Sequence, residues 1–150
     1  MAIIRATTDG QTVVVKSGDT VIIDIDGGGT VNIVADPDAN IRTFRIVFEG
    51  DDQADTAIID LNTFSNYDLH IDVRDYDPSD SVVLMSAFDR YVSEGNEDEY
   101  NFSYVGEGGA TFNGFLRAKD KDERDFTTSP PPLVVCFAQG TIINTDLGPT

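Results

Sequence analysis

The sequence contains no tryptophan, one cysteine, one histidine and no long hydrophobic run. A single cysteine cannot build an internal disulfide framework. No apolar stretch approaches the ~20 residues of a membrane-spanning helix, so we expect no insertion into a membrane. The amino terminus, Met1–Arg5, lacks the basic and apolar regions of a signal peptide. We therefore expect any export from the cell to use another route.

Basic residues are also scarce. The chain carries 10 lysines and arginines against 27 aspartates and glutamates, a formal net charge of −17. Binding to phosphates requires lysine and arginine, so this balance argues against a nucleic-acid partner. It favours solubility, cation binding or a basic partner, and it suits a protein exposed to saline surroundings. We expect a location outside the cell or on the surface of a particle such as a virion.

Hydrophobic residues make up 40% of the chain, enough for one globular domain with a core. Short runs of β type are separated by turns rich in Gly, Asp, Asn and Pro. Apolar and polar residues alternate clearly in 44–49 and 69–74, which is typical of half-buried strands. One short helix is predicted at 87–93. The predicted strands are 12–16, 20–26, 30–35, 43–49, 56–61, 69–74, 81–86, 100–105 and 110–117.

These runs predict a single all-β domain of about nine short strands. Two architectures fit them, a sandwich or jelly roll and a parallel β-solenoid. A polar stretch at 118–132 ends in Pro130–Pro132 and has the composition of a linker. The predicted organisation is therefore a β-rich body at 1–117, a linker at 118–132 and an extended C-terminal arm at 133–150.

The arm contains a motif that begins at Cys136 and reads C-F-A-Q-G-T-I-I-N-T-D-L-G. It resembles the opening block of Hint (hedgehog/intein) self-processing domains, C-F-x-x-G-T-x-I-x-T-x-x-G. The resemblance implies that Cys136, in a complete domain, is the nucleophile that attacks the carbonyl of Val135. Such a domain also needs downstream histidines, and the single histidine here, His70, lies in the body. We therefore expect no self-cleavage by this chain and no enzymatic activity.

A weaker similarity covers residues 69–89. An apolar strand, the segment D-Y-D-P-S-D and a second apolar strand resemble the ends of repeats-in-toxin β-rolls. The resemblance implies Ca²⁺ as a cofactor, bound by aspartates of stacked turns. A degenerate nonapeptide at 50–58 offers further carboxylates, but one copy cannot build a calcium ladder. The alternative is that these side chains cap turns. The candidate metal ligands are Asp75, Asp77, Asp80, Asp51 and Asp55.

Aromatic residues at 100–104 and at Phe112 and Phe115 suggest a sugar- or peptide-binding face, although aromatics on strands also fill cores. A second candidate surface is the apolar arm. Left exposed, it would be an unpaired strand, and Pro130–Pro132 limit its return to its own body. We therefore predict strand addition to a neighbouring subunit, as a homo-oligomer or on a larger assembly. The arm residues are Leu133, Val134, Val135, Phe137, Ile142 and Ile143.

Together these features predict a non-enzymatic, self-associating structural protein of an extracellular or particle surface, such as a surface array, a filament or a capsid decoration. In this interpretation the Hint-like block is an inactive remnant. The alternative is the passenger region of a secreted, calcium-binding Hint protein whose full-length form cleaves itself before Cys136.

Overall fold

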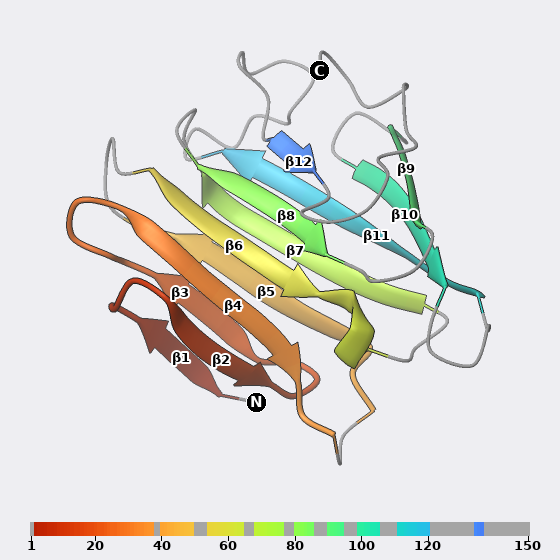
Figure 1. Cartoon of the computed structure of the whole chain (residues 1–150), viewed down its shortest axis with the longest axis horizontal. Coiled ribbons are helices and arrows are strands. Elements are labelled where there is room, and N and C mark those ends of the chain that lie inside the picture. Colours follow the sequence, from red (N-terminus) through yellow and green to blue (C-terminus); the bar gives the residue numbers. More distant parts are fainter. Residues whose placement is uncertain are drawn as a thin grey trace.

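The computed structural model describes residues 2–37, 40–49, 54–64, 68–76, 80–85, 90–94, 99–105, 111–120 and 134–136. These residues form strands and one 3₁₀ turn, η1 (Leu61–Thr63), with no α-helix among them, so the predicted all-β class is confirmed. Figure 1 shows the arrangement. The strands are β1 (Ile3–Ala6), β2 (Gln11–Val15), β3 (Thr20–Ile23), β4 (Gly29–Ala35), β5 (Thr43–Phe48), β6 (Asp55–Asp60), β7 (Asp68–Tyr76), β8 (Ser81–Met85), β9 (Arg90–Glu94), β10 (Glu99–Val105), β11 (Thr111–Asp120) and β12 (Val134–Cys136).

The strands make two sheets. A seven-stranded sheet has the order β1-β3-β5-β7-β11-β10-β9, and a five-stranded sheet has the order β12-β8-β6-β4-β2. From β1 to β8 the chain alternates between the sheets, and each strand pairs in parallel with the strand two places later. Antiparallel pairing occurs where β10 joins β9 and β11. The two layers lie face to face in Figure 1.

The core fills the space between the two sheets. Phe44, Ile46 and Phe48 of β5 are buried, and so are Leu69 and Val73 of β7, as the alternation predicts. Each such side chain contributes about 1.5–3 kcal/mol when it leaves water. The residues between them along the strands face outward, so the same alternation that builds the core sets out the polar side chains of the outer face.

The turn from β3 to β4 depends on glycine. Gly27 and Gly28 both have left-handed backbone conformations, with φ of 80° and 85°. A Cβ atom on Gly28 would lie 2.8 Å from the carbonyl oxygen of Ala54, whereas one on Gly27 would meet nothing within 4 Å. Gly28 therefore also allows the close approach of the segment that leads into β6.

The local structure differs from the predictions in three places. The helix predicted at 87–93 is wrong, because Arg90–Glu94 form β9 and pair antiparallel with β10. The backbone partner offered by β10 outweighs a weak helical spacing of one or two turns. The short strand β1, which pairs with β3, was not predicted. β11 runs to Asp120, beyond the predicted boundary of the body.

Part of the predicted arm pairs with the chain's own body. Val134–Cys136 form β12, which lies parallel to β8, with Val135 opposite Val82 and Cys136 opposite Val83. The chain therefore returns to its own sheet after the three prolines, and the argument that they would limit this return was wrong. Leu133, Phe137, Ile142 and Ile143 lie outside the described residues.

Candidate functional site

Two rows of side chains cross the outer face of the seven-stranded sheet. In the first row the strand register places Thr43 of β5 beside His70 of β7, and His70 beside Phe115 of β11. In the second row, two residues further along each strand, Arg45, Asp72 and Arg117 are neighbours. Side chains two positions apart on a strand share a face, so the two rows form one surface of mixed chemistry.

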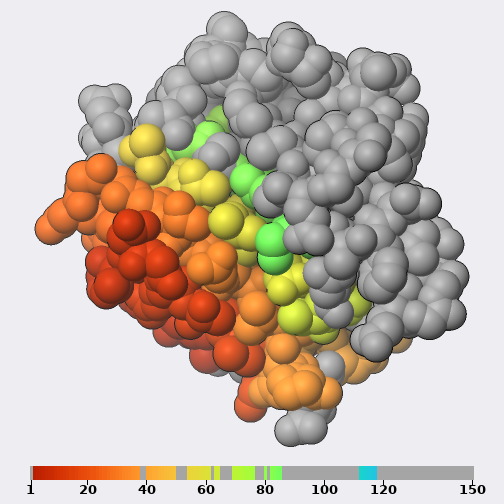
Figure 2. Space-filling view, in the orientation of Figure 1, coloured from red at the N-terminus to blue at the C-terminus, as the bar shows by residue number. Residues whose placement is uncertain are grey.

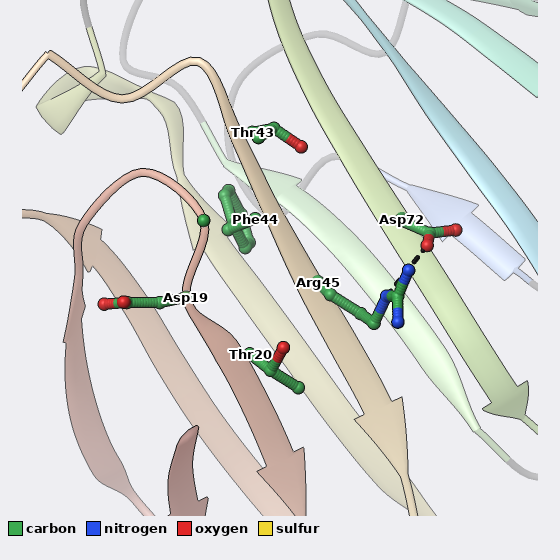
Figure 3. A pocket seen from close by; sticks show the side chains of 7 residues that line it. Asp19, Thr20, Thr43, Phe44, Arg45 and Asp72 are labelled. Atoms are coloured by element: carbon green, nitrogen blue, oxygen red, sulfur yellow. Dashed lines mark hydrogen bonds and ion pairs between the residues drawn. The ribbon is translucent and has the colours of Figure 1, made fainter. Parts of the chain in front are cut away.

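This surface is hollowed in two places. A cavity of about 260 Å³ lies over β3, β5 and β7 and is partly open to solvent. Figure 3 shows Arg45 bonded to Asp72 among the residues that line it. A second cavity of about 210 Å³ lies over β5, β7 and β11. Thr43 and Asp72 line both, so the cavities are adjacent parts of one groove. The first is lined by Gly18, Asp19, Thr20, Thr43, Phe44, Arg45 and Asp72, and the second by Thr43, His70, Ile71, Asp72, Phe115 and Arg117.

Asp72 organises the charges of this groove. Its Oδ2 accepts a hydrogen bond from Nε of Arg45, and its Oδ1 accepts one from Nε of Arg74, both at 2.9 Å. Bonds to ionised groups are among the stronger hydrogen bonds in proteins, so the three side chains hold each other in place. Asp72, Arg45 and Arg117 line the groove, so it presents both signs of charge within a chain of net charge −17. Asp19 also lines the first cavity, but its carboxylate is buried against backbone N–H groups.

The aromatic part of the groove is also fixed. The rings of His70 and Phe115 pack with centroids 3.9 Å apart and planes tilted by 39°. The guanidinium carbon of Arg117 lies 5.8 Å from the centre of the Phe115 ring, within cation–π range. Phe112, named with Phe115 in the sequence, is instead buried in the core. Phe112 therefore belongs to the core, and Phe115 belongs to the surface of the groove.

Three of the predicted metal ligands, Asp55, Asp75 and Asp80, lie within the described residues. Asp55 and Asp80 are buried, and Oδ1 of Asp80 accepts a hydrogen bond of 3.2 Å from the backbone N–H of Asp55. Oδ1 of Asp55 in turn accepts one of 3.2 Å from the N–H of Gly29. These two aspartates come together, but as caps at the starts of neighbouring strands. Asp51 and Asp77 lie outside the described residues.

Asp75 is directed away from the core by a bulge. Its backbone is left-handed, with φ of 60°, and the β7–β11 register shifts at this point. The bulge leaves Asp75 exposed while the next residue, Tyr76, is buried. Within the described ranges, no group of three or more His, Cys, Asp or Glu side chains is placed to hold a metal ion.

Asp19 was missed by sequence reasoning. It is 4% exposed, and its two carboxylate oxygens accept hydrogen bonds from the N–H groups of Ala2 and Lys16, each at 2.8 Å. Asp9 acts similarly, since its Oδ1 accepts a bond of 2.8 Å from the N–H of Thr30. The sequence signal that indicates both residues is an aspartate in a turn that leads into a strand.

Cys136 and His70 lie in different sheets. Cys136 ends β12 of the five-stranded sheet, while His70 is on the outward row of the seven-stranded sheet. The buried core separates that outward row from the other sheet. The Val135–Cys136 peptide lies in a regular strand pairing with β8.

Comparisons with protein-family models, with curated proteins and with solved structures find no match to this chain. The part of the chain that the structure describes contains no helix with the length and apolar character needed to span a membrane.

Proposed function

We propose that this protein is a non-enzymatic structural protein of an extracellular or particle surface that associates with further copies of itself. The observation that carries the proposal is the end of the molecule built by β1 and β2. These strands are the terminal strands of the two sheets, and they contact each other. In Figure 2 the residues nearest the amino terminus gather at this end.

The two edge strands are unusually apolar. The four residues of β1 and the five of β2 include one charged side chain, Arg5, although a quarter of the chain is charged. Ile3 on β1 is 75% exposed and Val14 on β2 is 49% exposed, and these are the exposed large hydrophobic residues of the described ranges. Edge strands are ordinarily protected by charges, prolines or bulges, which discourage pairing with another chain. Here that protection is slight.

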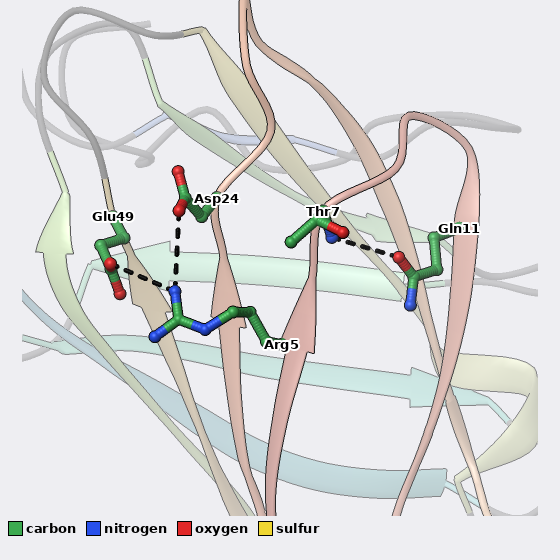
Figure 4. Close-up of polar contacts among 5 residues, drawn as sticks. All are labelled: Arg5, Thr7, Gln11, Asp24 and Glu49. Atoms are coloured by element: carbon green, nitrogen blue, oxygen red, sulfur yellow. Dashed lines mark hydrogen bonds and ion pairs between the residues drawn. The ribbon is translucent and has the colours of Figure 1, made fainter.

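Arg5 is directed toward its own sheet. Its Nη1 lies 3.2 Å from Oε1 of Glu49 and 3.6 Å from Oδ2 of Asp24, as Figure 4 shows. These are exposed pairs, so they add little stability, but they engage the one positive charge of β1 and β2 with residues that directly follow β3 and β5. Arg5 therefore leaves the edge open to a second strand.

A second copy is the partner that fits this end best. A two-fold axis beside β1 brings the same edges of two copies together in antiparallel pairing, and the contact closes on itself. At the opposite end the edges of the two sheets are not level with each other, because the seven-stranded sheet has two more strands than the five-stranded one. This geometry supports head-to-head association. The pairing of β12 with β8 supports the same choice, because Val134 and Val135 already occupy an edge of their own sheet.

The contact is small. The edge residues number fewer than the ~20–30 per side of a standard protein interface. We therefore expect a weak dimer in solution, with a Kd of roughly 10 μM or higher. Many weak contacts act together when copies are displayed on one surface, because the effective concentration is then high.

Sedimentation velocity over a range of concentrations tests the proposal. The protein should shift from monomer to dimer as its concentration rises, and Ile3→Lys and Val14→Lys should each remain monomeric. Asn113→Lys is the matched control, because Asn113 is exposed on β11 in the interior of the sheet. A chain lacking residues 133–150 should still dimerise. A wild-type protein that stays monomeric, or a dimer lost only with the tail, would contradict the N-terminal contact.

The second candidate function is the passenger region of a secreted Hint protein whose full-length form is cleaved before Cys136. The motif at Cys136 favours it, since cysteine, glycine and threonine stand at Hint spacing. For that cleavage, β12 would have to leave β8, because the peptide to be cut is now part of the pairing. Continuing the chain after Asn144 with the remainder of a Hint domain, so that Cys136 is the first residue of the completed domain, and assaying thiol-dependent release of residues 1–135 tests this alternative.

A further inference from the structure

We infer that the groove over β3, β5, β7 and β11 is a binding site for a neutral saccharide. The inference is independent of self-association, because the groove lies on the outer face of the seven-stranded sheet and not on its edge. It rests on three properties of the groove, namely an outward aromatic ring, balanced hydrogen-bonding groups and the size of its two cavities.

The apolar surface of the groove is the ring of Phe115. This side chain is half-buried, lines the second cavity and packs against the ring of His70. The contact with His70 fixes the orientation of the ring before any ligand arrives. A sugar ring has an apolar face of C–H groups that packs against an aromatic ring and leaves its hydroxyl groups at the rim.

The polar groups around Phe115 suit hydroxyl groups. A hydroxyl both donates and accepts hydrogen bonds, so a site for several of them needs donors and acceptors side by side. Asp72 and Thr43 supply oxygen acceptors between the two cavities, while Arg45 and Arg117 supply donors on either side of Asp72. The paired strands hold these groups at fixed spacing.

The presence of both signs of charge in the groove disfavours ionic ligands. An anionic ligand would meet the carboxylate of Asp72 and the strong negative charge of the whole chain. A cationic ligand would meet Arg45 and Arg117. A neutral ligand with many hydroxyl groups avoids both costs and uses the donors and acceptors together.

The dimensions of the groove indicate a chain-like ligand. Its cavities of about 260 and 210 Å³ are each smaller than the ~300–1,000 Å³ of pockets that enclose a drug-sized molecule. Because they share Thr43 and Asp72, they lie close enough to take successive units of one chain. We therefore assign the site to a neutral oligosaccharide of two or more units.

The test is a titration of the whole chain with a panel of soluble neutral α- and β-linked hexose tetrasaccharides. Tetragalacturonate and poly-L-glutamate serve as acidic sugar and acidic peptide probes. Binding is followed by the NMR shifts of the His70 and Phe115 ring protons and by calorimetry. At least one neutral tetrasaccharide should bind saturably, and its affinity should change less than about twofold between low and high salt, since no net charge is neutralised.

Matched variants locate the site. Phe115→Ala and Arg117→Gln should each weaken binding by roughly tenfold or more, the loss expected for one good contact or one charge-assisted hydrogen bond. Ile22→Ala and Arg5→Gln remove similar groups from the same face but line neither cavity, so they should leave the affinity unchanged. Circular dichroism of each variant confirms that it is folded. The inference is overturned if no neutral tetrasaccharide binds, if an acidic probe binds more tightly, or if folded Phe115→Ala binds as well as the wild type.

Discussion

Replacing Asp19 tests how the first strand is attached to the body. Its carboxylate accepts two backbone hydrogen bonds of 2.8 Å, one from Ala2 directly before β1 and one from Lys16 before the turn. A hydrogen bond to a charged group contributes about 1.5–3 kcal/mol. Ala2 and Lys16 are both exposed residues, so water recovers part of the loss when the carboxylate is removed. We expect Asp19→Ala to lower the free energy of unfolding by about 2–4 kcal/mol, a large share of a typical total of about 5–15 kcal/mol.

Urea unfolding followed by far-ultraviolet circular dichroism measures this loss. Asp19→Asn keeps one acceptor, so it should lose about half as much as Asp19→Ala. Asp26→Ala removes the same charge from an exposed position and corrects for the relief of repulsion among acidic groups. Hydrogen exchange at the N–H of Thr20, which donates to the carbonyl of Ala2, should also become faster. A loss within ~0.5 kcal/mol of that of Asp26→Ala would refute the assigned role.

Three further predictions follow from the turns and the tail. Gly28→Ala should destabilise the protein by at least about 1 kcal/mol more than Gly27→Ala in the same urea assay, because only Gly28 also faces the carbonyl of Ala54; equal losses would contradict this. Removing Ca²⁺ with EDTA should leave the β-sheet circular dichroism intact, since Asp55 and Asp80 bond to backbone N–H groups, and a loss restored by Ca²⁺ would favour a calcium-dependent fold. The Val135–Cys136 bond should stay intact in excess thiol by mass spectrometry, because the peptide lies in a strand pairing; a fragment ending at Val135 would show otherwise.

The strand pattern was readable because burial alternates along each strand. Residues 44–48 and 69–73 show the alternation in the sequence and in the structure, since one face of each strand packs in the core. β9 was misassigned because its apolar residues are too few to distinguish a helical spacing from an alternating one. Its structure depends on β10, which supplies the backbone partner.

The groove could be predicted only in part. The sequence placed His70 on the polar face of a strand and identified Phe115 as an aromatic residue on another strand. Their contact, however, depends on the pairing of β7 with β11. Because β8, β9 and β10 intervene in the sequence, no local pattern indicates that pairing. The same holds for Asp55 and Asp80, which are 25 residues apart and meet through the pairing of β6 with β8. The residue type suggested metal ligands, and the structure adds that both carboxylates are buried and accept hydrogen bonds from backbone N–H groups.

These caps also bear on how the protein can change in length. Gly29 and Asp55 are 26 residues apart in the chain, and Asp55 and Asp80 are 25 apart, yet each pair is joined by a hydrogen bond at the starts of neighbouring strands in the five-stranded sheet. Inserting or deleting one whole unit of this size would add or remove one strand in each sheet and would leave every other contact between neighbours in place. Inserting a single residue within a strand would instead reverse its inward and outward faces. Duplication of a complete unit is therefore a mutation that this molecule is built to tolerate.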